Sequence, residues 1–112
     1  MIDMNLIDER NSKARILDAS IKELSKTGRD YASAYTNYRM ALAKELVKLK
    51  DEGYAITLAN DIARGKPEIA KLKFDEICKE AIYKANLEAI NVYKLEVKIL
   101  ESDISREWGN EQ

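Results

Sequence analysis

Apolar residues recur every seven positions through the first half of the chain. One series consists of Leu17, Leu24, Tyr31 and Tyr38, and a second consists of Ile21, Gly28, Tyr35, Leu42 and Leu49. The two series alternate at spacings of three and four residues, which is the a/d pattern of a helix that packs along a seam. Mixed charges fill the positions between them, as on a solvated helix face. The pattern predicts a long helix over about residues 6–52.

Gly28 interrupts this seam. A glycine inside a helix costs about 1 kcal/mol relative to alanine, so its presence there requires a reason. It allows close packing of a neighbouring helix, or a local kink, or a division of the segment into two helices. We expect one continuous helix, which can be bent at this position.

The residues that interrupt helices gather near the middle of the chain. Gly53 is placed to end the first helix in a left-handed conformation. Thr57 is placed to cap a short helix over about residues 58–64, which Gly65 would end. Pro67 suits the first turn of a third helix, which we expect to reach about residue 108.

The predicted third helix has more apolar residues than one packing stripe needs. Phe74, Ile77, Cys78, Ala81, Ile82 and Ala85 share one direction, and Leu87, Ile90, Val97, Leu100, Ile104 and Trp108 drift around the helix. A helix with so wide an apolar face requires more than one neighbour. A single partner helix covers one side of it, and we therefore expect a homo-oligomer.

Together these elements predict an all-α fold. We expect one domain over residues 1–112, made of two long antiparallel helices (a helical hairpin or coiled coil) with a short helix at the turn. Leu42 and Ile90 are expected in its core. Few glycines and a single proline argue against sandwiches and barrels, which need many tight turns.

Composition excludes several kinds of chemistry. The 112 residues include no His and one Cys, with 19 basic and 20 acidic side chains. The lack of His removes the commonest general base and metal ligand, and Cys78 is read as a buried, inert thiol. No nucleotide-loop or nucleophile-elbow motif is present. We predict a protein that is not an enzyme and has no cofactor and no metal.

Charge and hydropathy also limit the predicted partners and location. Acidic and basic residues alternate without a basic stripe, which argues against nucleic acid as a partner. No run approaches the roughly 18 consecutive apolar residues that a membrane span needs. A free thiol without a signal peptide favours the cytoplasm.

Tyrosine is over-represented, with six residues against one Phe and one Trp. Tyr31, Tyr35 and Tyr38 fall on one side of the first helix. Tyrosine suits a position where the ring is buried and the hydroxyl reaches water or a partner. These residues therefore form either an amphipathic packing face or a platform on which a base or peptide stacks.

The central segment has the densest polar functionality. Asn60, Arg64 and Lys66 lie in the short helix and its exit, next to the unpaired backbone N–H groups of the third helix. The two cations are able to hold a phosphate through charge-assisted hydrogen bonds. The alternative is a hairpin turn that has ordinary solvated residues.

Three segments of the chain resemble short helical proteins encoded by phages and prophages of Gram-positive bacteria. The segments are YRMALAK at 38–44, GYAITLANDIARG at 53–65 and ISREWG at 104–109. Proteins of this kind are encoded in early regions near recombination and single-strand-binding genes. The resemblance implies a bacterial cell and transfers no catalytic or binding residue.

We predict a non-enzymatic phage accessory protein that binds and sequesters a small anionic nucleotide signal. Small helical oligomers of this type act in phage counter-defence, and the likeness is one of architecture alone. The expected ligand-binding residues are Asn60, Arg64, Lys66, Tyr31, Tyr35 and Tyr38. The alternative is a helical adaptor for a host or phage replication or recombination protein.

Overall fold

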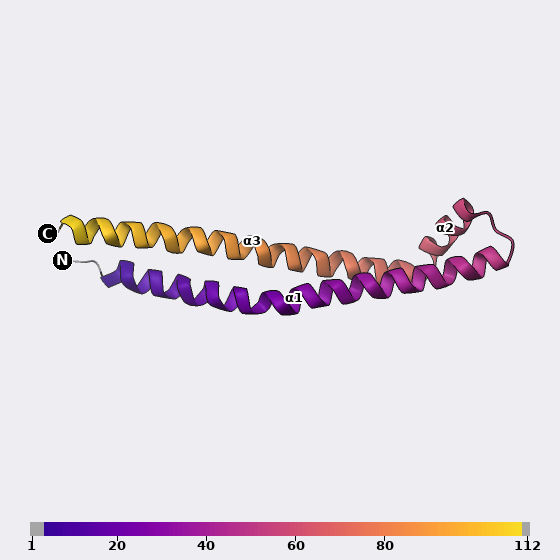
Figure 1. The fold of residues 1–112 in the computed structure, drawn as a ribbon, viewed down its shortest axis with the longest axis horizontal. Coiled ribbons are helices and arrows are strands. Elements are labelled where there is room, and N and C mark those ends of the chain that lie inside the picture. The colour runs from indigo at the N-terminus through magenta and orange to yellow at the C-terminus, as the bar shows by residue number, and fades with distance from the viewer. Residues whose placement is uncertain (1–3, 111–112) are drawn as a thin grey trace. The chain divides into compact units, whose positions relative to one another are not determined.

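The computed structural model of the protein describes residues 4–110 and contains three α-helices there, with no strand (Figure 1). Helix α1 spans Met4–Asp51, α2 spans Ile56–Gly65 and α3 spans Pro67–Asn110. The predicted all-α fold is confirmed, as is the order of a long, a short and a long helix. The observed ends lie within a few residues of the predicted ones.

The helices form two compact units, which are described separately. The central unit is Thr27–Tyr83 and contains α2 with the adjoining parts of α1 and α3. The terminal unit combines Met1–Lys26 with Lys84–Gln112. Each long helix contributes a segment to both units.

In the terminal unit, α1 and α3 pack antiparallel, as the order of their contacts shows. Arg10 Nη2 lies 2.7 Å from Glu101 Oε1, and Lys13 Nζ lies 3.0 Å from Glu96 Oε2. Farther along α1, the Ser20 carbonyl accepts a hydrogen bond of 2.9 Å from the Asn86 side chain. Increasing numbers on α1 therefore meet decreasing numbers on α3.

Buried aliphatic residues lie between these polar contacts of the terminal unit. Ile90 and Leu100 are both buried on α3. The predicted core position of Ile90 is confirmed.

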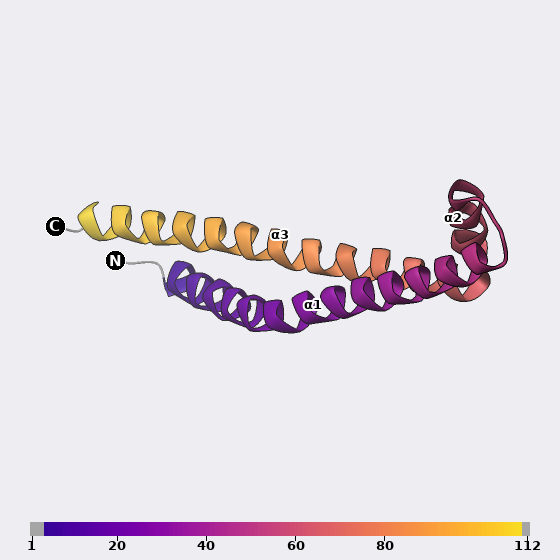
Figure 2. The ribbon, with the colours of Figure 1, turned by 45° about the vertical axis from the view of Figure 1, so that its right-hand side comes forward.

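The core of the central unit brings all three helices together. It consists of Tyr38, Leu42 and Leu49 of α1, Ala59 and Ala63 of α2, and Ile69 of α3. The two alanines have no bulk beyond Cβ, which lets the backbone of α2 approach its neighbours closely. Figure 2 shows α2 beside the last turns of α1. Leu42 is buried as predicted.

One predicted series of the α1 seam is wrong before Leu42. Tyr35 is 48% exposed and Ile21 is 45% exposed, although both were assigned to the seam. Ala34 and Thr27 are buried instead. A helix with 3.6 residues per turn drifts against a strict seven-residue repeat. Here the buried residues Thr27 and Ala34 each precede a residue of the predicted series by one position.

Gly28 lies within a continuous helix, as predicted, because α1 runs unbroken through it. A Cβ atom placed on Gly28 would lie 3.4 Å from a ring carbon of Tyr83 on α3. The Tyr83 ring therefore packs beside Gly28 and leaves room for no side chain much larger than a methyl group.

The end of α1 has the geometry expected from Gly53. Its φ of 96° is left-handed. The Gly53 N–H donates to the Lys50 carbonyl at 3.0 Å, and the Tyr54 N–H donates to the Leu49 carbonyl at 3.2 Å. This pair of bonds is the Schellman motif, which satisfies the last carbonyl groups of a helix.

The predicted limits of α2 need two corrections. Thr57 is not the cap, because α2 begins at Ile56 after an extended Ala55 that makes no side-chain cap. Gly65 does not end the helix through a left-handed turn either, since its φ is not positive. The extended conformation of Lys66 ends α2, because the residue before a proline is disfavoured in the helical region. Pro67 begins α3 as predicted.

Several large apolar side chains of α3 are exposed. In the central unit Phe74, Ile77 and Ile82 are exposed, with Phe74 at 69%. In the terminal unit Val92, Leu95 and Ile99 are exposed. Cys78, which was expected to be buried, is partly exposed on the same helix. Between residues 4 and 110, no helix is both long and apolar enough to cross a membrane.

Candidate functional site

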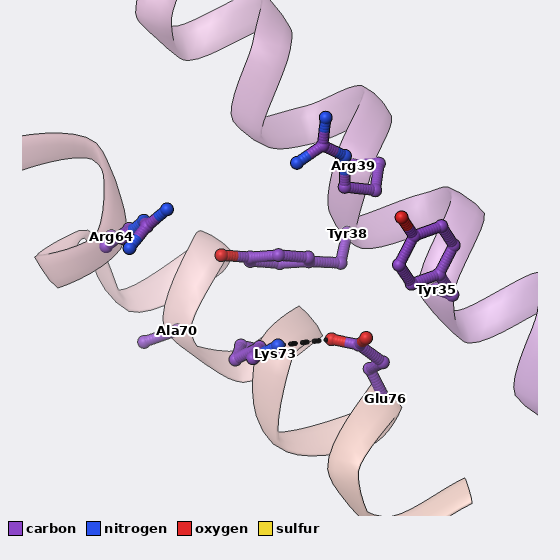
Figure 3. Close-up of a pocket in the computed structure, with 7 residues that line it drawn as sticks. All are labelled: Tyr35, Tyr38, Arg39, Arg64, Ala70, Lys73 and Glu76. Carbon is purple, nitrogen blue, oxygen red and sulfur yellow. Dashed lines mark hydrogen bonds and ion pairs between the residues drawn. The ribbon is translucent and has the colours of Figure 1, made fainter. Parts of the chain in front are cut away.

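A recess of about 390 Å³ opens in the central unit where α1, α2 and α3 meet (Figure 3). Seven residues line it: Tyr35, Tyr38 and Arg39 of α1, Arg64 of α2, and Ala70, Lys73 and Glu76 of α3. Three of the seven are cations and two are tyrosines. We call this cavity the tyrosine recess.

The floor of the tyrosine recess is an interlocked group of three side chains. The Tyr38 ring is buried, and Lys73 Nζ lies 4.9 Å from its centroid. The same ammonium group lies 2.8 Å from Oε2 of the buried Glu76. The hydrogen bond to Glu76 raises the pKa of Lys73 above its ordinary value, against the opposing effect of desolvation. Lys73 therefore stays charged and neutralises the buried carboxylate.

Arg39 and Arg64 are the other two cations of the tyrosine recess. They come from different helices, and neither has a hydrogen bond or ion pair among residues 4–110. Figure 3 shows the Tyr38 hydroxyl pointing toward Arg64, with Arg39 on the α1 side of the same ring. Two guanidinium groups without a carboxylate partner leave excess positive charge here. Such a pair suits phosphate or another oxyanion, which it can bind in a bidentate manner.

A second recess of about 250 Å³ lies between α1 and α2 in the same unit. Its lining consists of Arg39, Leu42, Ala43 and Leu46 of α1 with Asn60 and Arg64 of α2. The Asn60 amide nitrogen donates to the Ile56 carbonyl at 3.0 Å, which leaves its carbonyl oxygen as an acceptor. We call this cavity the leucine recess. It shares Arg39 and Arg64 with the tyrosine recess.

The structure brings together part of the predicted ligand set. Tyr35, Tyr38 and Arg64 line one recess, and Asn60 lines the adjoining one. Tyr31 lies elsewhere, with its ring centroid 5.9 Å from that of Tyr83. It packs on α3 and lines neither recess.

Lys66, which was predicted to bind phosphate, makes an ion pair within the protein. Its ammonium group pairs with the Glu45 carboxylate of α1, outside both recesses. The hydrogen bond between them raises the pKa of Lys66 and lowers the pKa of Glu45. Lys66 thereby ties the α2–α3 connection to α1, and Arg39 is the second cation beside Arg64.

Arg39 was not among the residues predicted from the sequence. It directly follows Tyr38 in a helix that has many exposed cations. The available signal was its spacing of four residues from Tyr35, which places both side chains on one side of α1. That signal does not distinguish it from other cations of the helix without the position of α2.

The two arginines without partners give the tyrosine recess a lining that suits an anion. Within the described stretch, no three acidic or thiol side chains converge in a way that could hold a metal ion. No family model, curated protein or solved structure matches the chain. The lining residues themselves therefore define what the site can bind: an anionic group at the arginines and a flat group against the exposed Tyr35 ring.

Proposed function

We propose that this protein binds a small anionic nucleotide without covalent chemistry and sequesters it. The observation that supports the proposal is the pair Arg39 and Arg64, which face one recess from two helices and lack carboxylate partners. The geometry of a guanidinium group matches phosphate and carboxylate oxygens, and a nucleotide presents phosphate. Tyr35, which is half exposed at the same recess, offers a ring on which a base can stack.

The burial of Glu76, the carboxylate of the tyrosine recess, favours retention of the ligand over its chemical conversion. Glu76 is buried and bonded to Lys73, and a general base must reach the proton that it abstracts. The proposal is therefore a binding protein that returns its ligand unchanged. Its place among phage accessory proteins, and a role against a host immune signal, rest on the resemblance described above.

A thermal-shift screen against linear and cyclic nucleotides tests the proposal. A ligand at 100 times its dissociation constant stabilises the folded state by about 2.7 kcal/mol. Arg39→Gln and Arg64→Gln should each reduce the shift. Arg29→Gln is the matched control, because Arg29 is an exposed α1 cation that lines neither recess.

Two results would contradict the proposal. One is that no nucleotide shifts the melting curve. The other is a shift that is the same in the Arg39→Gln, Arg64→Gln and Arg29→Gln proteins. Recovery of chemically unchanged nucleotide after denaturation of the complex would separate sequestration from enzymatic turnover.

A helical adaptor is the second candidate, and the exposed apolar residues of α3 favour it. Phe74 and Ile77 of the central unit are 69% and 54% exposed, and exposed apolar patches often mark protein contacts. An adaptor should retain a replication or recombination protein in a pull-down and lose it in Phe74→Glu. The nucleotide site variants should then have no effect on that capture.

A further inference from the structure

We infer that the ligand has its phosphate in the middle and an organic group on each side, as in a dinucleotide. The inference rests on the proposed function and adds the class of ligand. Its basis is that Arg39 and Arg64 line both the tyrosine recess and the leucine recess. A ligand with a terminal phosphate would use only one of the two.

The order of residues along α1 places the arginines between the recesses. Tyr35 and Tyr38 precede Arg39 and line the tyrosine recess, whereas Leu42 and Leu46 follow it and line the leucine recess. The opposite walls differ as well. Residues of α3 close the first recess, and Asn60 of α2 closes the second. Arg39 and Arg64 therefore stand at a junction with a cavity on each side.

The sizes of the cavities agree with a ligand in two parts. Sites for small molecules have volumes of about 300–1,000 Å³. The tyrosine recess, at about 390 Å³, lies near the lower limit, and the leucine recess, at about 250 Å³, lies below it. One nucleoside can occupy the first recess, and the second remains available for another group joined through the phosphate.

The two linings would recognise their groups differently. In the tyrosine recess a base can stack on the half-exposed Tyr35 and contact the Lys73 ammonium group. In the leucine recess a base would rest on aliphatic side chains. There the Asn60 carbonyl oxygen, left open by the bond from its nitrogen to Ile56, can accept a hydrogen bond from an exocyclic amino group.

Calorimetric titration with matched mono- and dinucleotides tests the inference. The probes are the four ribonucleoside monophosphates and the corresponding homodinucleotides, joined by a 3′–5′ phosphodiester or a 5′–5′ diphosphate. We expect at least one dinucleotide to bind about tenfold more tightly than its mononucleotide. Ala43→Gln, which fills the leucine recess from an exposed position, should remove that advantage.

Matched variants separate failure of the inference from failure of the proposed function. Ala32→Gln, at an exposed α1 position that lines neither recess, should change neither affinity. Equal affinity of the wild-type protein for both ligand types overturns the inference, as does a dinucleotide advantage that survives Ala43→Gln. The proposed function would still stand in both cases. Absence of binding by every probe, or binding that persists when Arg39 and Arg64 are both changed to Gln, overturns the proposed function as well.

Discussion

Gly28 is the residue at which α1 accommodates an aromatic ring. A methyl group at this position would lie 3.4 Å from Tyr83, which is an ordinary contact, and alanine favours a helix by about 1 kcal/mol over glycine. We therefore expect Gly28→Ala to stabilise the protein by about 0.5–1 kcal/mol. Gly28→Leu should destabilise it, because the larger side chain meets the Tyr83 ring. Urea denaturation measures both changes.

The opposite ranking would contradict this account of Gly28. If Gly28→Ala costs more than about 1 kcal/mol, the space beside Tyr83 is smaller than described and the glycine is required. If Gly28→Leu is neutral, the ring does not pack on this turn of α1, since surface substitutions usually lie within about 0.5 kcal/mol.

The Glu45–Lys66 pair predicts a dependence of stability on pH. The pKa of Glu45 is lowered in the folded protein by its hydrogen bond to Lys66. The unfolded chain therefore binds the Glu45 proton at a higher pH than the folded protein does. The stabilisation is complete above the ordinary value of 4.5 and is lost as the pH falls through the lower folded value.

Melting curves between pH 3 and pH 7 test this dependence. Glu45→Gln should lower Tm at neutral pH, and its difference from the wild-type protein should narrow as the solution becomes acidic. Glu23→Gln is the control at an exposed position of the same helix. The Tm difference between Glu45→Gln and the wild-type protein could instead be the same at every pH. The charge of Glu45 would then not stabilise the protein through its pair with Lys66.

At the scale of helices, the packing seam predicts where truncation is costly. Leu42 in the central unit and Ile90 in the terminal unit are buried. Changing either to Ala should cost about 2–5 kcal/mol. Val47→Ala and Leu95→Ala remove comparable side chains from exposed positions and should stay within about 0.5 kcal/mol. Chemical denaturation measures the free energy of unfolding of the four variants. Equal losses for the buried and the exposed positions would contradict the assigned faces.

The helices were predictable because their signals are local. Gly53 and Pro67 act on the backbone within a few residues of themselves, and seven-residue spacing marks a helix wherever it packs. The inward residues were harder to predict, because burial of Ala34 rather than Tyr35 depends on how α3 crosses α1. Larger apolar residues are usually the buried ones, but here Ala34 is buried and Tyr35 is exposed.

The site was predictable only in part, because partners are chosen by the fold. Arg64 and Lys66 look alike in sequence, being two residues apart in one polar segment. The difference comes from Glu45, twenty-one residues before Lys66. Its carboxylate pairs with Lys66, and Arg64 has no such partner among the described residues. Arg39 is likewise a site residue only because the fold places Arg64 of α2 at the same recess.

At the scale of the whole molecule, the exposed apolar residues of α3 predict self-association. Phe74 and Ile77 in one unit and Leu95 and Ile99 in the other expose apolar surface, and large exposed apolar patches are rare on soluble monomers. We expect a dimer or larger species by light scattering at micromolar concentration. Phe74→Glu and Leu95→Glu should shift the protein toward the monomer.

Val47→Glu is the control for this prediction, because Val47 is an exposed apolar residue of α1. It should leave the mass unchanged. A well-folded 12.8 kDa species in the wild-type protein would show that α3 needs no second copy. The single domain predicted over residues 1–112 stays a prediction, which one cooperative unfolding transition would support.

The connection between α2 and α3 consists of one residue, and its side chain is held by α1. Helix α2 ends at Gly65 and α3 begins at Pro67, so only the backbone of Lys66 separates them. The Lys66 ammonium group is paired with Glu45, six residues from Arg39 on the same helix. The helix backbones that carry the two arginines are thus held close to each other. For the ligand proposed above, this tie would lower the cost of bringing the two helices together. Lys66, which lines neither recess, would then contribute to affinity without touching the ligand.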